Sequence, residues 1–132
     1  MRVYIADRLS KVRSAFRLLI EQDLDGVVVG EASCSLDLMR DIRACSPELL
    51  ILDWDLPGLA VDGNDRIAPL RKAIPDCQVL AVQSQGSANG SGKIHKADAV
   101  IRKGDSPERV LEVLRALHQN GTEGRDQVPQ GE

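Results

Sequence analysis

Aromatic side chains are nearly missing from this chain of 132 residues, in which phenylalanine, tyrosine and tryptophan occur once each. Without clustered aromatics there is no platform on which nucleic-acid bases could stack. The net charge of −3 and the lack of a block of basic residues argue against binding to a phosphate backbone or an acidic membrane surface. We therefore expect no nucleic-acid contact by this domain itself and no membrane association.

Cysteine and histidine are also scarce. Cys34, Cys45 and Cys77 are odd in number and show no CxxC spacing, and the only histidines are His95 and His118. A zinc site or a disulfide framework is therefore not expected, whereas free buried thiols in a reducing compartment are. The first apolar stretch is too short for a signal peptide, and no run is long enough to span a bilayer. The sequence predicts a soluble, cytoplasmic domain.

One short stretch near the middle of the chain organises the rest. Residues 49–52 are four apolar residues in a row, which is typical of a strand buried on both faces of a parallel sheet. Asp53 follows where the strand should end, and Pro57-Gly58 then turns the chain away. In open α/β sheets, ligands and reacting groups lie beyond the carboxyl ends of the strands. A carboxylate there is placed for chemistry rather than for the core.

Four further apolar segments are predicted to be strands, and helical patterns alternate with them. These strands are residues 3–6, 27–30, 79–82 and 99–102. Strands that alternate with helices, joined by right-handed crossovers, form a parallel sheet with helices on both faces. The predicted fold class is therefore α/β, with a doubly wound five-stranded parallel sheet.

Three helical segments illustrate the pattern. Ser10 is expected to cap the first helix, whose apolar stripe is Val12, Ala15, Phe16 and Leu19. The last helix should have Ser106 as its N-cap and Pro107 as its first helical residue. Residues 83–92, where a fourth helix would lie, contain almost no apolar side chains, so we expect that helix to be weak or disordered.

The predicted topology brings polar residues together. Asp7, Asp53, Gln83-Ser84 and Lys103 each stand where a strand ends. Because the strands are parallel, these ends meet at one edge of the sheet. Each residue alone would be unremarkable, and it is their convergence that indicates a functional site.

With these residues in place, the sequence from 1 to about 118 resembles the receiver domain of two-component response regulators. Residues 51–58, Ile-Leu-Asp-Trp-Asp-Leu-Pro-Gly, look like the phosphoacceptor strand and turn of that family. Ala6-Asp7 matches the acidic motif after the first strand of that family. Lys103 matches the lysine that ends its fifth strand. Residues 2–7 and 106–111 look most like regulators with a C-terminal helix-turn-helix output domain. The resemblance implies a flavodoxin-like receiver fold with strand order 2-1-3-4-5.

The resemblance also implies a mechanism and partners. Asp53 would be the phosphoacceptor, served by a histidine kinase, another signalling protein or a small phosphodonor. Mg²⁺ would lie in an acidic pocket at Asp7, Asp53 and Asp55, because clustered negative oxygens need compensating positive charge. A homodimer is a further expectation, and an output domain outside this chain could bind DNA. Residues 119–132 would be a disordered tail or a truncated linker.

The sequence departs from the family pattern at several positions. Arg8 stands where a second acidic residue is expected, and Asp55 stands where a backbone carbonyl would bind the metal. At the switch positions, Gln83 replaces the usual Ser or Thr with Ser84 one step beyond, and Val100 replaces the usual aromatic. A positive charge in place of a carboxylate turns attraction for Mg²⁺ into repulsion. We therefore expect weak Mg²⁺ binding, with Arg8 and Lys103 compensating the charge of the acids.

Three functions stay open at this point. The first is an atypical receiver in phosphorelay signalling and transcription regulation, with phosphorylation of Asp53 weak or absent. The second is a pseudo-receiver that binds a protein partner or small ligand without phosphoryl transfer. The third, more remote, is a haloacid-dehalogenase-like phosphatase, suggested by Asp53 and Asp55 after a buried strand. The first two are not enzymes, and we expect no enzymatic activity.

Overall fold

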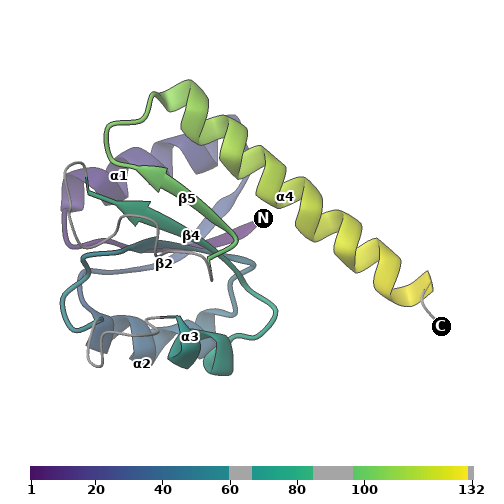
Figure 1. Ribbon diagram of the computed structural model, residues 1–132, viewed down its shortest axis with the longest axis horizontal. Helices are drawn as coiled ribbons and strands as arrows, with labels where there is room; N and C mark the ends of the chain where they lie inside the picture. Colours follow the sequence, from purple (N-terminus) through teal and green to yellow (C-terminus); the bar gives the residue numbers. More distant parts are fainter. Residues whose placement is uncertain (60–66, 85–96, 131–132) are drawn as a thin grey trace.

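The computed structural model describes residues 1–59, 67–84 and 97–130, with side chains as far as residue 119. Five parallel strands form one sheet in the order β2-β1-β3-β4-β5 (Figure 1). The strands are β1 Arg2–Ala6, β2 Val27–Ala32, β3 Leu49–Asp53, β4 Gln78–Gln83 and β5 Ala99–Arg102. The helices are α1 Ser10–Leu18, the π-helical turn η1 Leu19–Asp23, α2 Ser35–Cys45, α3 Ala68–Ala73 and α4 Pro107–Gln130. The predicted fold class and the strand order 2-1-3-4-5 are both confirmed.

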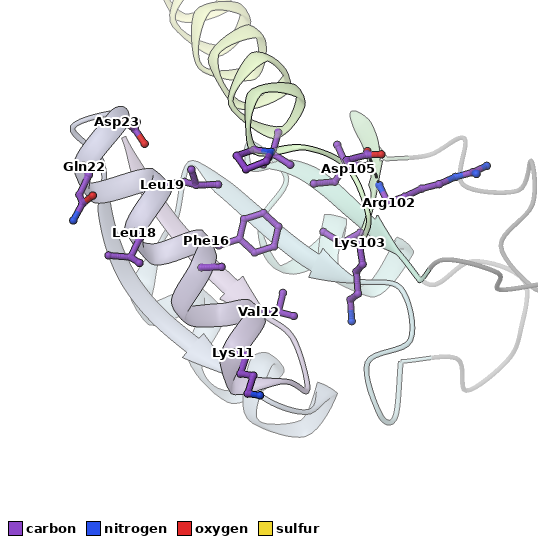
Figure 2. Close-up of a pocket in the computed structure, with 15 residues that line it drawn as sticks. Lys11, Val12, Phe16, Leu18, Leu19, Gln22, Asp23, Arg102, Lys103 and Asp105 are labelled. Carbon is purple, nitrogen blue, oxygen red and sulfur yellow. Dashed lines mark hydrogen bonds between the residues drawn. The ribbon is translucent and has the colours of Figure 1, made fainter.

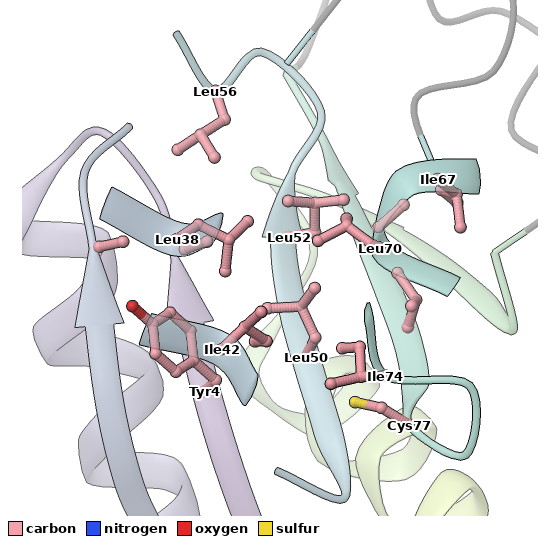
Figure 3. Packing of buried hydrophobic residues seen from close by; sticks show 14 of the residues in the cluster. Tyr4, Leu38, Ile42, Leu50, Leu52, Leu56, Ile67, Leu70, Ile74 and Cys77 are labelled. Carbon is pink, nitrogen blue, oxygen red and sulfur yellow. The ribbon is translucent and has the colours of Figure 1, made fainter. Parts of the chain in front are cut away.

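Helices cover both faces of the sheet, with α1 and α4 on one side and α2 and α3 on the other (Figure 1). Side chains that alternate along each strand therefore enter two separate cores. The core under α2 and α3 contains Tyr4, Leu38, Ile42, Leu50, Leu52 and Leu70 (Figure 3). The core under α1 and α4 contains Val3, Ile5, Phe16, Leu49, Ile51 and Leu114.

The central strand β3 is buried along its whole length. It pairs with β1 on one side and β4 on the other, so all of its backbone groups have partners available in the sheet. Each fully buried Leu or Ile side chain contributes about 2 kcal/mol of hydrophobic stabilisation. Gly58 ends the following turn with φ of 84°, a conformation that glycine adopts without strain. The chain thus turns away from the sheet soon after β3 ends.

The first helix differs from its prediction in two ways. Ser10 is the first helical residue rather than the cap, and Leu9 occupies the cap position without a side-chain hydrogen bond. Of the predicted apolar stripe, only Phe16 is buried, whereas Ala15 is exposed. Helical periodicity therefore identified the apolar face, but the layer opposite leaves part of that face uncovered.

The other helix boundaries agree with local chemistry. The second helix stops at Cys45, because Ser46 is in the left-handed region at φ 45° and precedes a proline. The last helix begins as predicted, with the backbone N–H of Arg109 donating to Ser106 Oγ over 3.2 Å. That bond satisfies one of the free donors of the first turn.

The last helix, α4, is longer than its apolar stripe. It continues to Gln130 and extends beyond the sheet (Figure 1), over residues for which the sequence predicted a disordered tail or a truncated linker. An established helix can propagate past its last buried turn, although Gly121, Gly124 and Pro129 are poor helix formers. The boundary of the domain at 118 stays a prediction. The weak or disordered fourth helix was predicted for residues 83–92, of which residues 85–92 lie outside the described part.

No helix in the described ranges is both long and apolar enough to cross a membrane.

Candidate functional site

The sheet places the predicted acidic and basic residues at one edge. Asp53 is the last residue of β3, Asp7 follows β1 directly, and Lys103 follows β5 directly. The register of the parallel strands aligns Ala6 with Leu52 and Asp53 with Val82. The carboxyl ends of the strands therefore meet, as the sequence predicted.

Two buried carboxylates share one lysine at this edge. Asp7 and Asp53 are 1% and 0% exposed. Lys103 Nζ lies 3.5 Å from Asp7 Oδ2 and 3.6 Å from Asp53 Oδ2, and its side chain is largely buried. A carboxylate that is removed from water requires a nearby cation or hydrogen-bond donors. Lys103 supplies charge to both acids at once.

Arg8 provides a second positive charge at Asp53. Its Nε atom lies 3.7 Å from Asp53 Oδ2, and its side chain is 46% exposed. The backbone N–H of Arg8 donates to the same oxygen over 3.4 Å. Asp53 is therefore the acid whose charge this guanidinium compensates. Asp53 Oδ2 thus faces cationic groups from β1 and β5 together.

The other oxygen of Asp53 is held by the turn that follows β3. The backbone N–H of Asp55 donates to Asp53 Oδ1 over 2.9 Å. The Asp55 side chain accepts a hydrogen bond of 2.6 Å from the hydroxyl of Ser84, just beyond β4. Sequence reasoning placed Asp55 and Ser84 at this edge but missed their bond. The available signal was position: Asp55 lies two residues after β3, and Ser84 lies one residue after the neighbouring strand β4.

Burial raises the pKa of Asp7 above its ordinary value. A hydrogen bond of 2.8 Å from the backbone N–H of Leu9 to Asp7 Oδ1 acts in the opposite direction. The nearby charge of Asp53 raises the pKa further, and Lys103 lowers it. Desolvation thus outweighs the compensating groups at Asp7.

The switch positions lie in different surroundings. Gln83 is buried at the end of β4, and its backbone carbonyl accepts from the N–H of Lys103 over 3.0 Å. Val100, on β5, is 37% exposed. Gln83 therefore belongs to the polar edge, whereas Val100 contributes to the surface of β5.

The donor set at this edge does not suit a divalent cation in its present arrangement. Mg²⁺ requires near-octahedral oxygen ligands. Asp53 Oδ2 faces Arg8 and Lys103, and the Asp55 carboxylate is bound to Ser84. Asp7 Oδ2 is buried without a hydrogen bond within the described part, but it faces Lys103. Among the described residues, no three His, Cys, Asp or Glu side chains are grouped to hold a metal ion.

Known proteins share this sequence pattern and fold. The family model of the response regulator receiver domain matches residues 3–115. A putative transcriptional regulator of Pseudomonas aeruginosa is 34% identical over 118 residues, which cover 88% of this chain and 56% of that protein. Response regulator UvrY of Escherichia coli O6:H1 is 26% identical over 119 residues, or 88% of this chain and 53% of UvrY. This chain spans about half the length of these relatives.

A comparison with solved structures finds the same fold. A DNA-binding response regulator of the LuxR family from Staphylococcus aureus matches with a TM-score of 0.73 and 25% identity, over 88% of this chain and 97% of that chain. The family match is therefore consistent with the strand order and with the polar site at the carboxyl edge of the sheet. The chain belongs to the family of response regulator receiver domains of two-component signalling.

Proposed function

We propose that this chain is an atypical receiver, in which Arg8 and Lys103 permanently supply the positive charge that a metal ion supplies transiently in the family. The observation that carries the proposal is the approach of two cations to one buried oxygen, Asp53 Oδ2. Phosphorylation of Asp53 with Mg²⁺ is then weak or absent, because the metal must compete with an arginine and a lysine.

Partner binding on this proposal does not require a phosphoryl group. The bonds from Asp55 N–H to Asp53 and from Ser84 to Asp55 hold the ends of β3 and β4 together. Networks of this kind favour one arrangement over others. The domain would stay in one state, recognised by a histidine kinase, another signalling protein or a second copy of the chain.

The wider function we propose is transcription regulation. Its support is the similarity to the putative transcriptional regulator of Pseudomonas aeruginosa. In such a protein a separate output domain would contact DNA, and the receiver would control it. The phosphatase alternative is set aside, because the whole matched region belongs to a signalling domain rather than to a hydrolase.

The test is intact-mass measurement with acetyl phosphate over a titration of Mg²⁺. We expect little phosphorylated protein in the wild type. Asp53→Asn should leave partner binding nearly unchanged, because the phosphoryl group is not the signal. Rapid, Mg²⁺-dependent phosphorylation, or loss of partner binding by a folded Asp53→Asn variant, would show instead a phosphorylated switch.

A further inference from the structure

A cavity of about 460 Å³ lies between α1 with η1 on one side and the end of β5 with the start of α4 on the other (Figure 2). Phe16 from α1, Val82 and Ile101 from the sheet, and Val110 from α4 contribute to its apolar walls. Volumes of this size, with apolar walls and few polar groups, are typical of sites for small organic molecules.

The cavity is present because the layer between α1 and α4 is not filled. Phe16 is the only phenylalanine in the chain, and the neighbouring stripe residue Ala15 is too small to reach across. Beyond Leu18 the helix changes from α to π geometry, and Leu19 of that turn also lines the cavity. π-helical turns within helices occur frequently at functional sites. Apolar space of this kind is poorly suited to water but suited to an apolar ligand.

Charge is distributed unevenly around the cavity. Figure 2 shows Lys11 at the start of α1 and Gln22 and Asp23 beyond its other end, whereas Arg102, Lys103 and Asp105 lie on the β5 side. Lys11 is exposed and forms no ion pair within the ranges that the structure describes. Lys103, in contrast, is already shared by two carboxylates. Arg102 also lines the cavity, but Figure 2 shows its side chain extending away from the apolar walls, so Lys11 is the cation that is available to an acidic group on a ligand.

We propose that this cavity binds a small anionic amphiphile, a molecule with one aromatic or alkyl body and one carboxylate or sulfonate. The body packs between Phe16 and Val110, where apolar area is removed from water. The acidic group lies near Lys11, outside the apolar walls, where it remains partly hydrated. The end that carries Asp23 disfavours a second acidic group, so the ligand has a single anionic head.

An occupant of the cavity would contact residues that hold the acidic site. Lys103 lines the cavity, and its Nζ lies 3.6 Å from Asp53 Oδ2. Val82 also lines the cavity, and its carbonyl accepts a hydrogen bond of 2.8 Å from the N–H of Trp54, next to Asp53. A ligand could therefore set the state of the domain where a phosphoryl group does not. This regulatory role rests on the proposed function, whereas binding itself does not.

The experiment uses two fluorescent probes that differ in charge, 1-anilinonaphthalene-8-sulfonate and its uncharged analogue N-phenyl-1-naphthylamine. Both should bind the folded wild-type protein saturably at one site, with increased fluorescence. Ala15→Trp places an indole in the cavity and should abolish the binding of both probes. Circular dichroism should show that this variant keeps its fold, because Ala15 is an exposed helical position.

A charge reversal then separates the two parts of the site. Lys11→Glu should weaken binding of the sulfonate probe by about threefold or more and leave the uncharged probe unchanged. The matched control is Lys72→Glu, an exposed lysine on α3, across the sheet from the cavity. This control should bind both probes like the wild type. Lys11→Glu keeps the test decisive even if Ala15→Trp fails to fold.

Three results would overturn the proposal. The first is the absence of saturable binding to the wild type, and the second is equal loss of the sulfonate probe in Lys11→Glu and Lys72→Glu. The third is a wild-type dimer in sedimentation that becomes monomeric in Ala15→Trp, because a second copy would then cover the cavity. These titrations use unphosphorylated protein. If neither probe binds, the phosphorylation result is unaffected. If Asp53 is phosphorylated, the unphosphorylated protein should still bind both probes.

Discussion

The Nε atom of Arg8 lies 3.7 Å from Oδ2 of Asp53, at the position where a family member of ordinary sequence would carry a second acid. The contact joins a half-exposed guanidinium to a fully buried carboxylate. An exposed arginine retains part of its hydration, so its contribution to stability is smaller than the distance alone suggests. The arginine should weaken Mg²⁺ binding more than it stabilises the fold, because Mg²⁺ would have to approach the same oxygen.

Arg8→Asp should create a metal site from this contact. The variant restores a pair of carboxylates beside β1 and removes the competing guanidinium. Without Mg²⁺ it should be less stable than the wild type, because three buried or half-buried acids would then share only Lys103. Added Mg²⁺ should restore stability in the variant and change the wild type little.

Calorimetric titration with Mg²⁺ and thermal unfolding measure both effects. Arg40→Asp, on the exposed face of α2, is the matched control, since it makes the same change in net charge away from the site. Tight binding of Mg²⁺ by the unmodified protein would contradict this prediction and the proposed charge compensation together.

Ser84→Ala should destabilise the domain by about 1 kcal/mol, because a hydrogen bond to a charged group is lost and the Asp55 carboxylate stays partly buried. The bond concerned is the 2.6 Å contact from Ser84 Oγ to Asp55 Oδ2. Urea unfolding measures the change. Ser14→Ala on the exposed face of α1 is the control and should be neutral or slightly stabilising. Equal stability of the two variants would show that the Ser84 bond contributes nothing.

The sequence predicted most of the fold because its strands are short apolar runs with clear boundaries. The convergence of Asp7, Asp53 and Lys103 then followed from topology, since parallel strands have their carboxyl ends at one edge. The bond between Ser84 and Asp55 could not be predicted in this way. It depends on the rotamers of two side chains beyond the strand ends, which no periodicity describes.

Two other features lay outside what a sequence pattern can show. The stripe of Val12, Ala15, Phe16 and Leu19 identifies which face of α1 is apolar, but not how completely the opposite layer fills it. The cavity is a property of both layers. Amphipathic periodicity also ends near Leu117, so it cannot show that the backbone of α4 continues to Gln130.

Glu31→Gln should destabilise the domain by about 1 kcal/mol at neutral pH, because Glu31 links two arginines in a partly buried network. Arg13 Nε donates to its Oε1 over 3.0 Å, and Arg17 contacts its Oε2 through two nitrogens. Burial alone would raise the pKa of Glu31, but the hydrogen bonds and charges of both arginines lower it overall. These contacts tie α1 to β2.

The pH dependence of this effect has a definite sign. Because the folded-state pKa of Glu31 is lowered, its contribution is present above the ordinary value of 4.5 and is lost as the pH falls through the lowered pKa. The difference between Glu31→Gln and the wild type should therefore shrink in acid. Urea unfolding at several pH values measures it. Glu112→Gln, which breaks an exposed pair on α4, should show no comparable difference at any pH.

Lys103→Met should produce the largest loss of stability, about 3 kcal/mol at neutral pH, because it leaves two buried carboxylates without their shared cation. The methionine keeps most of the apolar volume of the lysine stem, so the loss reports charge rather than packing. As the pH falls, Asp7 protonates and the loss should shrink. The raised pKa of Asp7 indicates that this recovery starts above the ordinary range of an aspartate.

A double variant tests the cause. Adding Asp53→Asn to Lys103→Met removes one of the two negative charges, so it should recover much of the lost stability at neutral pH. Lys72→Met on the exposed face of α3 is the control for the substitution itself and should change stability little. If Lys103→Met is as stable as this control, or if Asp53→Asn adds a further loss to it, the lysine does not neutralise the acidic pair. The basis for a permanently compensated receiver would then be lost.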